Sequence, residues 1–150
     1  MPQSLANIYI HLIFSTSDRQ PLLTDDIRPS LHSYLGQVGK TLGCPIILVN
    51  SVEDHVHILH RLSRTVTISK AVEEFKKSTS KWLKSQSPDL ANFSWQSGYG
   101  AFSVSESNLD SVTIYIQNQR EHHRTKFFQD EFREFLIKNN LPFDENHLWD

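Results

Sequence analysis

The chain has 150 residues, a net charge of −2 and a single cysteine, Cys44. This length fits one domain over residues 1–150 that folds without a metal ion or a disulfide. No apolar run approaches the ~20 residues of a membrane span, the first residues lack the features of a signal peptide, and the composition is not that of a disordered protein. We therefore expect a single cytoplasmic domain.

The first half of the chain predicts a strand, a helix and a hairpin. Both alternating faces of residues 7–16 are apolar, which is typical of a central strand. The apolar spacing that follows predicts a helix over residues 24–42, with Asp25 and Asp26 in its first turn and Gly43 at its end. The hairpin consists of strands over residues 45–50 and 55–62.

The second half predicts one more strand and three helices. In chain order these are a helix over 67–85, a strand over 99–105, a helix over 108–121 and an amphipathic helix over 127–139. The order of elements indicates an α+β fold: a ferredoxin-like, split βαβ antiparallel sheet with packed helices, to which the helix over 108–121 is added. The phenylalanine spacing in the last helix favours a packing role over a role in covering a site.

Positive charge is concentrated in one part of the chain. Residues 61–84 contain seven basic and two acidic side chains, within a protein that is acidic overall. Four of the lysines recur at helical spacing and share one side of the predicted helix: Lys70, Lys77, Lys81 and Lys84. A solvated helix face is one explanation, and a surface that binds a polyanion is the other.

Histidines are clustered in the strand that follows the hairpin turn. His55 and His57 are two residues apart, so that they point to the same face and can share one metal ion. Asp54 is placed to orient one of the imidazoles. A histidine-triad hydrolase is excluded because the third position on that face is Leu59, whereas His60 points to the other face.

The helix over 108–121 contains residues that complement this pair. Tyr115 and Gln119 are one helical turn apart and lie on one face. A tyrosine hydroxyl can act as a nucleophile, and an amide oxygen can bind a hard cation. Taken alone, these residues are explained structurally, as a core tyrosine and a surface glutamine. Together with a histidine pair and a basic stripe, they indicate phosphate chemistry on a divalent ion.

Together these motifs resemble the HUH endonuclease superfamily, and more specifically the single-tyrosine, IS200-like transposases of simple bacterial insertion sequences. The resemblance covers nearly the whole chain. It rests on the histidine pair, on the Tyr-x-x-x-Gln spacing and on three stretches: YIHLIFST at 9–16, DHVHIL at 54–59 and WQSGYGAFSVS at 95–105. One departure is the loop Ser17-Asp18-Arg19-Gln20, which is less basic than in many members and puts DNA contacts there in doubt.

The resemblance implies an activity and a set of roles. His55, His57 and Gln119 would hold Mg²⁺ or Mn²⁺, and Tyr115 would cleave single-stranded DNA to give a 5′-phosphotyrosine that a 3′-hydroxyl can reverse, with His122 as a candidate base. It also implies hairpin DNA as the ligand, a homodimer that can share active sites, and a bacterial protein associated with the nucleoid when acting. The expected phosphate contacts are Arg61, Lys70, Lys77, Lys81, Lys84, Arg120 and Arg124.

Three other functions stay open from the sequence. A non-catalytic, domesticated module could bind single strands through a split βαβ sheet. A replication initiator or relaxase would use the same chemistry, but usually in a longer chain. A metal-dependent phosphohydrolase would use water, and would then retain activity without Tyr115.

Overall fold

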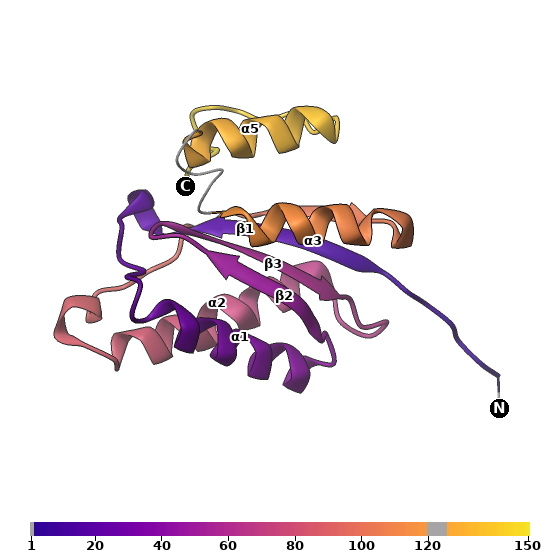
Figure 1. The fold of residues 1–150 in the computed structure, drawn as a ribbon, viewed down its shortest axis with the longest axis horizontal. Helices are drawn as coiled ribbons and strands as arrows, with labels where there is room; N and C mark the ends of the chain where they lie inside the picture. Colours follow the sequence, from indigo (N-terminus) through magenta and orange to yellow (C-terminus); the bar gives the residue numbers. More distant parts are fainter. Residues whose placement is uncertain (1, 120–125) are drawn as a thin grey trace.

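The structure is a computed structural model that describes residues 2–119 and 126–150, arranged as Figure 1 shows. The strands are β1 (Tyr9–Ser15), β2 (Ile46–Ser51), β3 (His55–Arg61) and β4 (Gly100–Val104). The helices are α1 (Arg28–Leu42), α2 (Ile68–Lys84), α3 (Leu109–Gln117) and α5 (Phe128–Lys138). Within these residues, none of the helices combines the length and apolarity needed to cross a membrane.

The four strands form one antiparallel sheet in the order β2-β3-β1-β4. α1 connects β1 to β2, and α2 connects β3 to β4, so that two crossovers flank the β2–β3 hairpin. This is the connectivity of the ferredoxin-like split βαβ sheet. The predicted α+β fold is therefore confirmed, and β1 and β3 are its two central strands.

The alternation of side chains along β1 separates two layers. Leu12 and Phe14 face one side and pack with buried residues of α1 and α2, including Leu35 and Phe75. Ile13 faces the other side and belongs to a second cluster with Phe102, Phe128, Phe132 and Leu136. Figure 1 shows α1 and α2 on one face of the sheet, with α3 and α5 on the other.

Two helix bounds differ from the sequence prediction. α1 begins at Arg28 rather than near residue 24, because the amides of Ile27 and Arg28 both bond to the Thr24 carbonyl in a turn, and Pro29 suits the first turn of the helix that follows. The two aspartates therefore precede the helix. Gly43, with φ of 73°, ends α1 as predicted. α3 ends at Gln117, before the predicted limit of 121, which lies outside the described residues.

One lysine of the basic region is an internal anchor. The Lys76 ammonium donates to the backbone carbonyls of Gln96 and Gly98, both at 2.7 Å, and to that of Ser97 at 3.2 Å. It also lies 5.2 Å from the centre of the Phe14 ring. Partial burial lowers the pKa of this ammonium to about 8. Lys76 thus fixes the segment that leads into β4.

Replacing Lys76 with methionine should lower the free energy of unfolding by about 1–3 kcal/mol, because three carbonyls lose their donor. Lys77→Met is the matched control, since Lys77 is the next residue and is exposed; its effect should stay within about 0.5 kcal/mol. Urea denaturation of both variants measures the difference. Equal effects would mean that the Lys76 contacts contribute nothing to stability.

A second stability prediction concerns His32, whose Nε2 lies 2.7 Å from the Ser51 hydroxyl. Burial and then the charge of Arg28 lower the pKa of His32 to about 4. Protonation therefore favours the unfolded chain, so that this contribution is complete above pH 6.5 and is lost as the pH falls toward 4. Between pH 7.5 and 4.5, wild type should lose more unfolding free energy than His32→Gln. Parallel losses in urea titrations would refute this.

Candidate active site

β3 places the histidine pair beneath α3 and α5. The side chains of His55 and His57 are 1% and 0% exposed, and their ring centres are 5.2 Å apart. Ser15 and Ile13 are their partners across β1. Both imidazoles therefore occupy the sheet face opposite to α1 and α2, as the alternation of strand residues requires.

Each imidazole is oriented through its Nδ1 atom. Asp54 Oδ1 lies 2.7 Å from Nδ1 of His55, and His11 Nε2 lies 2.8 Å from Nδ1 of His57. Burial holds the pKa of His11 well below its usual range, so that His11 is neutral and its Nε2 atom can accept a hydrogen bond from His57 Nδ1. Both pairings leave the Nε2 atoms for the centre of the site, which is the usual arrangement of metal-binding histidines.

A buried carboxylate from α5 completes this centre. Glu131 Oε1 lies 3.0 Å from His57 Nε2 and 3.6 Å from His55 Nε2. Glu131 is only 3% exposed. Ligand atoms of these three residues all lie within 4.8 Å of one another, which is close enough to surround a single metal ion. The donor set of two imidazoles and a carboxylate is one that divalent transition metals accept.

α5 reaches the site because β4 allows it to approach closely. A Cβ atom at Gly100 would lie 2.6 Å from the Phe132 ring, so that only glycine permits this packing. One turn earlier in α5, the Phe128 ring lies 4.4 Å from the His55 ring, centre to centre. The helix therefore both fills the second core and covers the histidine pair, whereas the sequence had favoured packing alone.

Tyr115 projects from α3 toward the same centre. Its hydroxyl donates to Glu131 Oε2 at 2.6 Å, and its ring centre lies 6.0 Å from that of His57. The end of α3 is held on the sheet by Asn50 of β2, whose amide donates to the carbonyls of Ile116 at 2.8 Å and Gln117 at 3.3 Å. One chain thus brings the tyrosine and both histidines together.

Gln119 lies at the edge of this group. Its Oε1 atom is 3.3 Å from His55 Nε2, and the side chain is fully buried. Its Nε2 atom has no hydrogen-bond partner among the described residues. A buried amide donor without an acceptor is costly.

The charges of the site depend on one another. Burial alone would lower the pKa of His55, but hydrogen bonds to Asp54 and Glu131 raise it to about 9. Burial would raise the pKa of Glu131, but the hydrogen bonds to His55 and His57 hold it well below its usual range. Burial, followed by the Glu131 charge, raises the pKa of Tyr115 above its ordinary value. In this arrangement Glu131 is ionised and Tyr115 is protonated.

The predicted phosphate contacts lie elsewhere. Lys70, Lys77, Lys81 and Lys84 are exposed on α2, on the opposite face of the sheet from the histidine pair. Lys70 also pairs with Glu74 at 3.1 Å. Arg61 is exposed at the end of β3 and donates to the Ala6 carbonyl. Arg120, His122 and Arg124 lie outside the described residues.

Two residues of the site escaped the sequence reasoning. The sequence predicts His11 only as part of a central strand, although it shares a face with Ile13 of the second core. Glu131 lies three residues after Phe128 and four before Phe135, which places a carboxylate on the apolar stripe of its helix. That misplaced charge is the signal that could have identified it.

Comparison with known proteins agrees with this geometry. Residues 4–119 match the family described as IS200-like transposase. Among solved structures, a Deinococcus radiodurans protein assigned as a transposase has 23% identity and a TM-score of 0.62, covering 79% of this chain and 98% of its own. A REP-associated tyrosine transposase bound to a REP hairpin has 16% identity and a TM-score of 0.58, covering 82% and 74%. Comparison with curated proteins gives no match.

Proposed function

This chain belongs to the IS200-like transposase family, and we propose that it cleaves and rejoins single-stranded DNA through Tyr115. One observation carries the proposal: the Glu131 carboxylate bonds to the Tyr115 hydroxyl through one oxygen and to His57 Nε2 through the other. The Glu131 carboxylate therefore lies between a candidate nucleophile, Tyr115, and two candidate metal ligands, His55 and His57, all within one chain.

The residues present fit a divalent cation. His55 Nε2, His57 Nε2 and Glu131 Oε1 would hold it, and Gln119 Oε1 is the nearest further oxygen. Gln119 Nε2, which makes no hydrogen bond of good geometry to a described residue, supports a phosphate beside this position, because it can donate to a phosphate oxygen. When bound, Mg²⁺ or Mn²⁺ would polarise the scissile phosphate and neutralise the charge of Glu131.

The state of Tyr115 decides when the reaction starts. Its hydroxyl donates to Glu131 Oε2, so that a cation that neutralised this carboxylate would remove the charge that opposes ionisation of the phenol, and the phenolic proton would end on the leaving 3′-oxygen. Tyr115 Oη then bonds to phosphorus, and the bond to the 3′-oxygen breaks, with a proton completing the 3′-hydroxyl. The 5′-phosphotyrosine keeps a phosphodiester bond, so that another 3′-hydroxyl can reverse the step.

Hairpin DNA is the proposed ligand. The REP-associated relative is bound to a hairpin, and the exposed lysines Lys77, Lys81 and Lys84 offer phosphate contacts on α2. Because these lysines and the histidine pair are on opposite faces of the sheet, one DNA molecule that contacts both must pass around a sheet edge. The homodimer stays a prediction, and the grouping of Tyr115 with the histidines needs no residue from a second chain.

An adduct assay tests the proposal. The protein is incubated with Mn²⁺ and labelled single-stranded DNA from the flanks of its own gene, and the products are separated on a denaturing gel. A covalent protein–DNA band that EDTA prevents is the expected result. Binding of the same DNA without an adduct on any strand would instead indicate a non-catalytic, domesticated binding module.

A further inference from the structure

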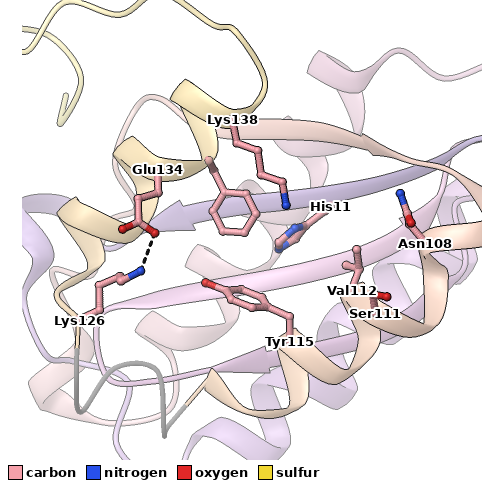
Figure 2. Close-up of a pocket in the computed structure, with 9 residues that line it drawn as sticks. His11, Asn108, Ser111, Val112, Tyr115, Lys126, Glu134 and Lys138 are labelled. Atoms are coloured by element: carbon pink, nitrogen blue, oxygen red, sulfur yellow. Dashed lines mark hydrogen bonds and ion pairs between the residues drawn. The ribbon is translucent and has the colours of Figure 1, made fainter.

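A cavity of about 560 Å³ adjoins Tyr115 without being lined by His55 or His57, and Figure 2 shows the side chains that line it. Pockets of roughly 300–1,000 Å³ are the usual size for small organic ligands. The lining comes from β1, from α3 and the turn before it, and from α5 and Lys126. The lining residues are His11, Asn108, Ser111, Val112, Tyr115, Lys126, Glu134, Phe135 and Lys138.

The charged groups of this cavity favour an anion. Lys126 pairs with Glu134, as the dashed line in Figure 2 shows. The Lys138 ammonium reaches into the cavity toward His11, and no described carboxylate pairs with it. The two lysines and one glutamate thus give the lining of the cavity a net positive charge. A phosphate group is the anion that a DNA strand would bring there.

The remaining groups suit a nucleobase. Phe135 lines the cavity and is fixed by packing on Phe102, with ring centres 5.3 Å apart. Aromatic side chains are the usual platforms for bases of single strands. Asn108 and Ser111 add an amide and a hydroxyl from the start of α3, and such groups bond to base edges.

The reaction geometry indicates which nucleotide lies here. In an in-line displacement, the 3′-oxygen leaves from the side of the phosphorus opposite to Tyr115 Oη. The nucleotide on the 3′ side of the cut stays joined to Tyr115 through its 5′-phosphate. It must therefore occupy space next to Tyr115, and the cavity is a space of suitable size that borders this side chain among the described residues.

Resting on the proposed function, we propose that this cavity holds the first nucleotide on the 3′ side of the cleaved phosphodiester. Its base packs on Phe135, and the next phosphate lies near Lys138. Lys126, Phe135 and Lys138 lie beyond the residues 4–119 that match the family. The C-terminal helix thus contributes to recognition of the cut site in this chain.

The test uses the full-length protein and the cleavage site identified from DNA left on Tyr115. Adduct formation is compared for this strand and for a strand with an abasic residue at the first 3′ position. We expect the abasic strand to react about tenfold less efficiently with wild type, and this difference to disappear in Phe135→Leu.

Lys138→Gln should lower kcat/KM about tenfold, whereas Lys40→Gln, on exposed α1 surface, should not change it. Equal effects of the two lysine variants, or an abasic penalty that persists in Phe135→Leu, would overturn the inference.

A binding measurement separates this inference from the proposed function. A fluorescent pentathymidylate with a 5′-phosphate mimics the 3′ product, and Lys138→Gln should weaken its binding relative to wild type and Lys40→Gln. If wild type forms no adduct but binding depends on Lys138, the proposed function fails and the nucleotide site remains. If an adduct forms but binding ignores Lys138, only the inference fails.

Discussion

Tyr115→Phe should abolish the covalent protein–DNA adduct and leave DNA binding intact. Phenylalanine keeps the ring contacts with His11, His57 and Phe135 and removes only the hydroxyl that donates to Glu131. Without the nucleophilic oxygen, the cleavage rate should fall at least about a thousandfold. The lost hydrogen bond should cost about 1 kcal/mol of stability. A denaturing gel, read beside a binding titration and a melting curve, measures all three.

Tyr99→Phe is the matched control, because Tyr99 is 39% exposed and lies outside the site; its adduct should equal that of wild type. An adduct that persists in Tyr115→Phe would identify another nucleophile. Cleavage without an adduct, retained in Tyr115→Phe and lost in His57→Ala, would point to a phosphohydrolase that uses water.

Glu131→Gln should weaken metal binding and destabilise the metal-free protein. The carboxylate lies within 3.6 Å of both Nε2 atoms, and replacing it by a neutral amide leaves the His55 imidazolium with one fewer negative partner. We expect Mn²⁺ affinity to fall at least tenfold, a figure of about the size seen for residues around metal sites. The free energy of unfolding of the metal-free protein should fall by about 3 kcal/mol, as it does when other buried ion pairs are broken. Calorimetric titration and urea denaturation give the two values.

The neighbouring carboxylate provides the control for this experiment. Asp130 is exposed on the same helix and pairs with Arg133, so that Asp130→Asn should change neither Mn²⁺ affinity nor, beyond about 0.5 kcal/mol, stability. Unchanged Mn²⁺ binding in Glu131→Gln would remove Glu131 from the ligand set. The set predicted from the sequence, with Gln119 as the third ligand, would then be preferred.

Local patterns were sufficient to predict the fold. The two apolar faces of residues 7–16 indicate a central strand, and β1 is paired on both sides. Strand alternation placed His55 and His57 on one face. The bounds of α1 were less accurate, because the signal of acidic residues near Thr24 competes with a turn closed by the Thr24 carbonyl.

The site was only partly predictable, for a physical reason. Tyr115 and Gln119 are four residues apart in the chain, although α3 ends between them at Gln117, and the histidines are two strand positions apart, so that short-range geometry relates each pair. Glu131 lies 74 residues from His57, and only the docking of α5 on β4 brings them together. The spacing of lysines on α2 correctly gave a shared exposed side, but it carried no information on which face of the sheet that side would occupy.

The cover that α5 forms has a topological consequence for substrate loading. His55, His57 and Glu131 are each at most 3% exposed, so that a phosphodiester reaches them only if part of the cover moves. Under the proposed function, a DNA strand that is cut at an internal position has no free end to pass beneath α5. It would have to enter the site from the side. α5 is held through the smaller of the two apolar clusters, whose buried members are Ile13, Phe102, Phe128, Phe132 and Leu136. If the helix undocks as a cooperative unit while the larger cluster stays folded, then under the proposed function the frequency of that opening would set an upper limit on how fast DNA is loaded.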